Sequence, residues 1–236
     1  MKRLAILLPL LVASLSPRAE SLREFLAHEE FEAAVHLPGE ARRGKEIYTY
    51  CVACHGPEGW GTVDGSYPQI AGQLPSVIIK QLADIRAGNR DNPLMRAFTS
   101  RRILSGPQEI ADVAAYISAL RMTPYNARGP QELAPWGAEI YRRECAECHG
   151  EQGEGDSEEH VPALAGQHYP YLVRQFEEIR AGRRRNADRK MVRQIQRFSR
   201  EEVLAVMAYC ASLRPPPERL APAGWTNPDF PSRRLP

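Results

Sequence analysis

Several features that mark other protein classes are missing from this chain of 236 residues. Its formal net charge is only +2, so no strong overall field points to a nucleic-acid partner. No alternating apolar and polar pattern predicts a strand. The longest apolar run, residues 4–15, is shorter than the about 20 residues that a membrane-spanning helix needs. The sequence therefore predicts a helical protein whose mature form has no membrane span.

Cysteine is also scarce, and its placement is informative. Four of the five cysteines lie in two copies of Cys-x-x-Cys-His, at 51–55 and 145–149, so no disulfide framework is expected. This pentapeptide is the attachment signature of c-type haem. Two thiols add across the porphyrin vinyl groups, and the adjacent histidine reaches the iron from one side. The pattern predicts two covalently bound haems, held by four cysteines and ligated by two histidines: Cys51, Cys54, Cys145, Cys148, His55 and His149.

Two other uses of paired cysteines fit less well. Zinc ribbons usually place their Cys-x-x-Cys pairs about 15–20 residues apart, whereas these pairs are 94 residues apart. Zinc also gives no reason for a histidine directly after both pairs. A thioredoxin-like dithiol motif would need a surrounding βαβ pattern, which is not visible.

The two halves of the chain repeat with a period close to 94 residues. The matching segments are 68–73 with 162–167, 81–88 with 175–182, and 115–120 with 208–213. A repeat this long, with a full motif set in each copy, indicates two duplicated domains. We therefore divide the chain into a signal peptide (1–19), an acidic N-terminal extension (20–40), a first domain (41–125), a linker (126–135), a second domain (136–214) and a proline-rich tail (215–236).

Each domain is predicted to contain three main helices. They are expected at 43–50, 76–87 and from Ser105 in the first domain, and at 136–144, 169–181 and from Ser199 in the second. Both final helices open with a capping-box pattern, Ser-x-x-Gln or Ser-x-x-Glu. The extension 20–40 predicts an amphipathic helix. The tail, with seven prolines in 22 residues, is expected to be extended rather than helical.

The N-terminus is typical of an export signal. A basic start, Met1–Arg3, precedes the apolar residues 4–15, and cleavage is expected near Ser16 or Ala19. The alternative is a short uncleaved anchor. Export fits the haem, because c-type haem is attached outside the cytoplasm, and we expect a periplasmic protein.

The second axial ligand of each iron is predicted to be a methionine. Met95 lies 40 residues after the first motif histidine, and Met191 lies 42 after the second, each in an expected loop before the final helix. A thioether is a soft ligand that raises the redox potential. Met122 and Met207 are instead expected to fill the core. For the second haem, His160 or His168 is an alternative ligand.

Two prolines are predicted to orient the axial histidines. Pro68 and Pro162 each lie 13 residues beyond their histidine, where a backbone carbonyl can accept the imidazole Nδ1–H bond. The alternative is an ordinary turn proline. Cys210, the remaining cysteine, aligns with Ile117 on the final helix and is expected to be buried; a thiolate ligand is the alternative.

Together these residues resemble the class I cytochromes c, and within them the two-haem cytochrome c4 family, over residues 41–213. The resemblance rests on the paired motifs, the Pro-x-Ile/Leu-Ala-Gly-Gln loops, the Ile-Arg-Ala-Gly helix ends and the Asn-Pro-Leu-Met loop. It implies an all-α fold of two tandem cytochrome c domains and a periplasmic electron carrier that often serves a terminal oxidase. Its ligand positions fall on His55, Met95, His149 and Met191.

Charge in the second half is segregated, and it bears on the partner. Residues 144–159 carry seven acidic side chains, whereas 180–200 carry nine basic ones and a single Asp. A basic rim near a haem edge would steer an acidic redox partner or a membrane-bound oxidase or reductase. Peripheral contact with anionic lipid and a merely solvated face are the alternatives.

Three classes of function follow from these features. We expect a carrier that relays single electrons from a quinol-oxidising complex or periplasmic dehydrogenase to an oxidase or reductase, and no catalytic residue. The second class is a cytochrome subunit docked in a larger complex. The third is a dihaem enzyme of the peroxidase or thiosulfate dehydrogenase type, which no acid/base cluster or flavin motif supports.

Overall fold

The computed structural model describes residues 17–231, and its regular secondary structure is helical. No strand occurs within that range, and the backbone bridges of Met122 with Leu220 and of Asp156 with Val161 are isolated. The all-α fold predicted from the sequence is therefore confirmed. Residues 1–16, most of the expected signal peptide, lie outside the described range. Between residues 17 and 231, no helix has both the length and the apolar character needed to cross a membrane.

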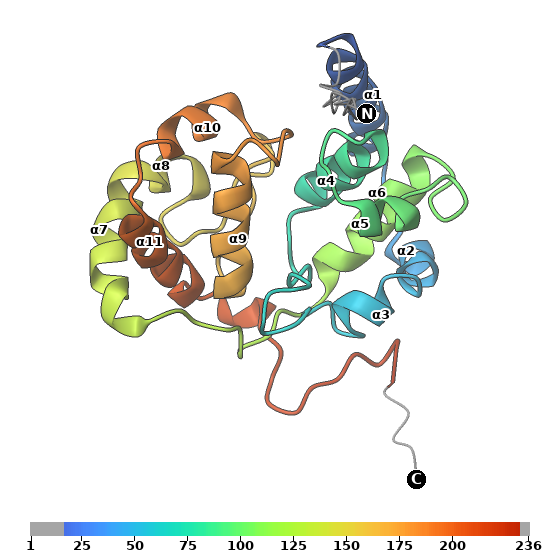
Figure 1. Cartoon of the computed structure of the whole chain (residues 1–236). Helices are drawn as coiled ribbons and strands as arrows, with labels where there is room; N and C mark the ends of the chain where they lie inside the picture. The colour runs from blue at the N-terminus through green and yellow to red at the C-terminus, as the bar shows by residue number, and fades with distance from the viewer. Residues whose placement is uncertain (1–16, 232–236) are drawn as a thin grey trace, which may run out of the picture.

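The helices form two halves that follow one another along the chain (Figure 1), each with its own apolar core. The first half holds α2 (Ala41–Tyr48), α3 (Val52–His55), α4 (Pro75–Ala87), α5 (Pro93–Phe98) and α6 (Pro107–Ala119). The second holds the 3-10 turn η1 (Gln131–Leu133), α7 (Ala134–Glu144), α8 (Ala146–His149), α9 (Tyr169–Arg180), α10 (Arg189–Ile195) and α11 (Arg200–Ser212). The helix order of the first half recurs in the second, as the sequence repeat predicts.

The same helix crossing organises both halves. α2 packs on α6, and α7 packs on α11. A Cβ atom on Gly44 would lie 2.0 Å from the Asp112 carbonyl oxygen, and one on Gly137 would lie 2.0 Å from that of Ala205. Only glycine permits this approach. Because α2 and α7 lead directly into the Cys-x-x-Cys-His turns, each crossing fixes where its turn begins.

The bounds of four predicted helices agree with the structure to within two residues: α2, α4, α7 and α9. The capping box of α11 is also confirmed, since the Glu202 N–H donates to Ser199 Oγ at 3.1 Å and the Ser199 N–H donates to the Glu202 carboxylate at 2.8 Å. In the first half the predicted box is displaced by one residue. Gly106, not Ser105, precedes α6, and its N–H donates to the Glu109 carboxylate at 2.9 Å.

A helix outside the repeat, α1 (Pro17–Val35), packs on α4 and α6. The helix predicted for the acidic extension is thus present, and it begins inside the segment assigned to the signal peptide. The predicted amphipathic character is wrong for the N-terminal half of this helix, because the side chains of Leu22, Phe25 and Leu26 are exposed. Glu30 forms an ion pair with Arg86 of α4. Three apolar side chains of α1 are buried: Ala27, Phe31 and Ala34. The extension therefore adds a helix to the first half.

The proline-rich tail packs back against the first half (Figure 1). It is non-helical as predicted, apart from the short 3-10 turn η2 (Pro217–Arg219). Asn227 is buried, and its Nδ2 donates to the Tyr116 hydroxyl at 3.0 Å. The Phe230 ring lies 5.6 Å from that of Tyr48. The tail of the second half therefore covers part of the first and is not a free arm.

A buried polar seam joins the halves. The Gln69 N–H donates to Gln167 Oε1 at 3.1 Å, and Gln167 Nε2 donates to the Gln69 carbonyl at 2.8 Å. Asn126, at the start of the expected linker, donates to the carbonyls of Gln167 and Ala211. Both glutamines come from equivalent loops of the repeat, so one loop type supplies both sides of the interface.

Candidate haem-binding cavity

A cavity of about 1500 Å³ reaches into both halves, and both Cys-x-x-Cys-His turns line it. Pockets for a single small molecule usually measure about 300–1,000 Å³, so this space suits more than one such group. All the predicted haem-binding residues line it: Cys51, Cys54, His55, Met95, Cys145, Cys148, His149 and Met191. Tertiary structure therefore brings both predicted ligand sets to one continuous space.

Each motif forms one helical turn, and a tyrosine hydroxyl donates a hydrogen bond to the backbone at its end. The glycine after each motif has a left-handed backbone, with φ of 78° at Gly56 and 80° at Gly150. The Tyr48 hydroxyl donates to the Gly56 carbonyl at 2.8 Å, and the Tyr141 hydroxyl donates to that of Gly150 at 2.6 Å. Sequence reasoning missed both tyrosines. The signal was an aromatic residue a few positions before each motif.

The two motif histidines, the predicted iron ligands, make the backbone contacts that the proline spacing predicts. His55 Nδ1 lies 3.0 Å from the Pro68 carbonyl oxygen, and His149 Nδ1 lies 3.0 Å from that of Pro162. Burial lowers the pKa of both imidazoles and outweighs the opposing effect of these hydrogen bonds. In a neutral ring whose Nδ1–H donates a hydrogen bond, Nε2 keeps a lone pair that can bind a metal. Nε2 has no hydrogen-bond partner in either ring within residues 17–231, so each is available to an iron.

The cysteines fit thioether attachment better than the alternatives. Burial raises the pKa of Cys51 and Cys145 to about 12, so neither is an activated thiolate of the dithiol-redox type. Cys51 packs against the core of the first half and Cys145 against that of the second. In the described part of the chain, no three His, Cys, Asp or Glu side chains are grouped to hold a metal ion. The residues present thus fit two covalently attached haems.

The methionines reach the cavity from short helices, and here the predicted loops are wrong. Met95 lies in α5 and Met191 in α10. Each backbone N–H is capped from the residue three positions earlier, Met95 by Asn92 Oδ1 at 3.1 Å and Met191 by Asp188 Oδ1 at 3.2 Å. Both side chains are half-buried. A capped first turn therefore presents each thioether to the cavity.

The other candidate ligands have different surroundings. His168 is buried between the halves, where Nε2 donates to the Trp60 carbonyl at 2.7 Å and Nδ1 accepts from the Ala127 N–H at 3.0 Å, which leaves no ring nitrogen for iron. The His160 ring packs edge-on against Phe31 at 4.7 Å. Cys210 is buried, as predicted, and burial raises the pKa of its thiol. Met122 and Met207 are also buried, as predicted.

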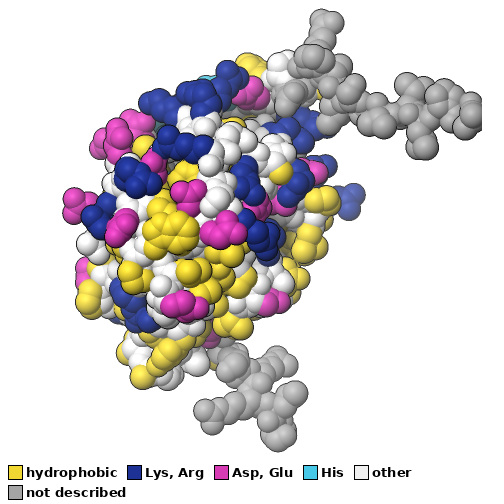
Figure 2. Space-filling view, turned by 60° about the vertical axis from the view of Figure 1, so that its left-hand side comes forward, with side chains coloured by type: hydrophobic (Ala, Val, Ile, Leu, Met, Phe, Trp, Pro, Cys, Tyr) yellow, Lys and Arg dark blue, Asp and Glu magenta, His cyan; other side chains and the backbone are white. Residues whose placement is uncertain are grey.

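Part of the basic segment faces the first half instead of a partner. Arg184 donates to Gln81 Oε1 at 3.2 Å, and Arg185 donates to the Gly88 carbonyl at 2.9 Å. The basic rim inferred from the sequence is therefore smaller than predicted. Figure 2 shows Lys and Arg side chains mainly over the upper part of one face of the molecule, with Asp and Glu side chains between them. The exposed basic residues of the segment are Arg183, Arg189, Lys190, Arg193, Arg197 and Arg200.

Comparison with known proteins gives concordant matches. The family model described as cytochrome c matches twice, over residues 41–121 and 136–214. Cytochrome c4 of Thiocapsa roseopersicina is 34% identical over 77% of this chain and 97% of its own length. The thiosulfate dehydrogenase electron acceptor of Stutzerimonas stutzeri is 32% identical over 75% of the chain and 89% of its own length. The crystal structure of reduced cytochrome c4 from Pseudomonas stutzeri matches with a TM-score of 0.66 and 28% identity, covering 75% of this chain and all of that one.

Proposed function

The chain belongs to the cytochrome c family, and we propose that it is a periplasmic carrier relaying single electrons from a quinol-oxidising complex or periplasmic dehydrogenase to a terminal oxidase or reductase. Its two cytochrome c domains bind two covalent haems c, as in the dihaem cytochromes c4, and its class is that of electron-transfer cytochromes. The electron donor, the electron acceptor and the periplasmic location are all parts of this proposal.

We assign the roles of the chain's own residues as follows. Cys51, Cys54, Cys145 and Cys148 would hold the haems, and His55, Met95, His149 and Met191 would ligate their irons. Bound haem supplies an iron that cycles between the ferric and ferrous states. The carbonyls of Pro68 and Pro162 hold the imidazoles in one tautomer and orientation. Capped methionines and fixed histidines leave little to reorganise when an electron moves.

One observation carries this proposal: every element of the ligand environment occurs twice around a single cavity. Both halves contain the Cys-x-x-Cys-His turn, the tyrosine that donates to the glycine after it, the proline carbonyl beside the histidine, and the methionine in a capped short helix. An enzyme of the peroxidase or thiosulfate dehydrogenase type would need one open or exchangeable iron site. Two equivalent sets of ligands support a carrier instead.

The test is optical spectroscopy of the oxidised and reduced holoprotein, with and without carbon monoxide. We expect two haems per chain, a far-red methionine–iron band of matching intensity, and no response to carbon monoxide. Met95→His should lower the potential of one haem and Met191→His that of the other, because imidazole favours ferric iron more than thioether does. Carbon monoxide binding, or a far-red band with the intensity of only one haem, would refute the carrier and indicate an enzyme with an open iron site.

The exposed basic residues around α10 support an acidic docking partner. Lys190 and Arg193 are exposed on the helix that carries Met191. Positive charge beside a haem ligand speeds encounter with a negatively charged protein. One candidate donor is a thiosulfate-oxidising dehydrogenase, because a relative is named as the electron acceptor of such an enzyme.

Stopped-flow reduction by the purified donor tests this surface. The rate constant should fall as ionic strength rises, and the double variant K190E/R193E should be slow and nearly salt-independent. The matched control is R101E/R102E, which changes the charge by the same amount at two exposed arginines of the first half. Equal loss in both variants would argue against docking at α10.

A further inference from the structure

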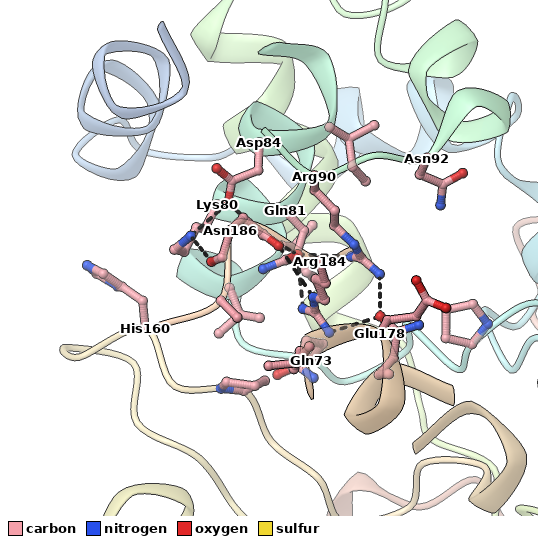
Figure 3. A pocket seen from close by; sticks show the side chains of 18 of the residues that line it. Gln73, Lys80, Gln81, Asp84, Arg90, Asn92, His160, Glu178, Arg184 and Asn186 are labelled. Atoms are coloured by element: carbon pink, nitrogen blue, oxygen red, sulfur yellow. Dashed lines mark hydrogen bonds and ion pairs between the residues drawn. The ribbon is translucent and has the colours of Figure 1, made fainter. Parts of the chain in front are cut away.

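Two arginines from different halves meet in the cavity (Figure 3). Arg90, in the loop after α4, donates to Gln81 Oε1 at 2.9 Å and to Gln175 Oε1 at 3.0 Å. Arg184, in the loop between α9 and α10, donates to the same two oxygens at 3.2 Å and 3.0 Å. Two positive charges are therefore held beside one pair of neutral amide oxygens.

Each guanidinium reaches across the boundary between the halves. Arg184 belongs to the second half and contacts Gln81 of the first. Arg90 belongs to the first half and contacts two residues of the second, Gln175 and the Tyr171 hydroxyl, the latter at 3.2 Å. Burial acts to raise the pKa of Tyr171, but the surrounding guanidinium charges outweigh it and lower that pKa. The phenol thus reports a locally positive potential.

Acidic side chains in this part of the cavity are engaged elsewhere. Asp84 is buried and forms an ion pair with Lys80 at 2.7 Å. Glu178 pairs with Arg183 at 2.9 Å. Within residues 17–231, no carboxylate forms an ion pair with either cavity arginine. Their hydrogen bonds are all to neutral groups of the protein.

Such an arrangement is unfavourable without a counter-charge. Two like charges repel one another, and a charge removed from water is costly unless an opposite charge compensates it. Burial, followed by the neighbouring charge of Arg90, lowers the pKa of Arg184 to about 10, so the group is still cationic at neutral pH. Asp84 is the carboxylate whose charge raises the pKa of Arg184, but it is already paired with Lys80, so positive charge exceeds negative charge around the two arginines.

We propose that Arg90 and Arg184 form one anion site, shared by the two halves, that binds propionate carboxylates of both haems. This inference rests on the proposed function, because it requires both haems. Each haem carries two propionates, and one cavity is lined by both attachment turns and both arginines. A guanidinium also matches a carboxylate with paired N–H donors. Each haem potential then depends on an arginine from the other half.

The test is a redox titration of the holoprotein and of R90Q and R184Q. Positive charge near a haem disfavours ferric iron, so its removal should lower the potential. Either substitution should lower the potentials of both haems. The Met95→His and Met191→His variants show which potential belongs to which half, because each of them shifts the haem of its own half. R184K, which keeps the charge, should restore most of the shift. R183Q is the matched control, because Arg183 is the adjacent arginine but is exposed and paired with Glu178.

Different results separate this inference from the proposed function. A chain with fewer than two haems, or with an iron that binds carbon monoxide, refutes the proposed carrier. If both haems are intact and six-coordinate but R184Q shifts only the second-half potential, the shared site is refuted and the proposed carrier stands. The same holds if R183Q shifts both potentials as far as R184Q does. If R184Q does not fold, R90Q and R184K measured by the same titration decide the matter.

Discussion

Replacing Gly44 by alanine tests the helix crossing that places the first haem-attachment turn. The added Cβ would lie 2.0 Å from the Asp112 carbonyl oxygen, whereas an ordinary contact is 3.4–4 Å. The obstacle is backbone, so α2 and α6 must separate by about 1.4 Å. Overpacking of this kind costs about 1–3 kcal/mol or more. Helix propensity acts in the opposite direction, since alanine is favoured over glycine by about 1 kcal/mol.

We expect the steric term to win, because no side-chain rotation relieves it. A steric cost at the upper end of that range, about 3 kcal/mol, opposed by about 1 kcal/mol of helix propensity, leaves a net loss of about 2 kcal/mol, or roughly a 30-fold increase in the unfolding equilibrium constant of the first half. Guanidinium unfolding of the holoprotein, followed by circular dichroism and haem absorbance, measures it. The two halves are followed separately, since two-state behaviour is not expected of two domains.

Two matched substitutions act as controls. Gly137→Ala repeats the change in the second half, where a Cβ would lie 2.0 Å from the Ala205 carbonyl oxygen, and should destabilise that half. Gly106→Ala meets no atom closer than 3.7 Å and should cost less than about 1 kcal/mol. If Gly44→Ala is as stable as the wild type, propensity outweighs the contact and the reasoning is refuted.

Three further predictions concern the first half. Truncation after Pro215 removes the Phe230 and Asn227 contacts and should destabilise the first half by about 2 kcal/mol, with no effect on the second. Thermal melts measure the stability of each half, and equal losses in both halves would contradict the prediction. Deletion of α1 uncovers a wall of the cavity and should lower the first-half haem potential more than that of the second half, because α1 packs on the first half and its loss admits water there. Redox titration measures both potentials, and an equal shift of the two would contradict the prediction. Burial acts to raise the pKa of Asp112, but hydrogen bonds from the Glu40 N–H, Gln108 and Arg43 outweigh it and hold the pKa below its ordinary value of 3.8. Its contribution to stability should be complete above pH 3.8 and lost as the pH falls through the lower folded value. Asp112→Asn should therefore flatten the acid limb of a profile of stability against pH, and an unchanged acid limb would contradict the reasoning.

Local spacing was sufficient to predict two covalent haems and the hydrogen-bond partners of both motif histidines. Cys-x-x-Cys-His defines one helical turn, and its partners lie at fixed distances along the chain. The 13-residue spacing placed Pro68 and Pro162 correctly because the intervening loop is short and turns on glycines, so sequence distance translates directly into geometry. The helix bounds followed from apolar periodicity and terminal signals in the same way.

The sequence alone was misleading where a residue's role depends on what packs against it. The methionine segments have no long periodic pattern and resemble loops, yet Asn92 and Asp188 cap short helices there. The sequence predicted that the proline-rich tail is extended but not where it lies, because its contacts, such as that of Phe230 with Tyr48, are with residues far away in the chain.

The sequence by itself determined two haem-binding helical domains, because covalent attachment and helical periodicity are local properties encoded over a few residues. Only the tertiary structure decided how those domains meet. Arg184 looked like one more member of a basic surface, since a run of arginines has the same composition whether it is solvated or buried. Its position beside Arg90 arises because equivalent glutamine loops pack against each other and turn the second half toward the first.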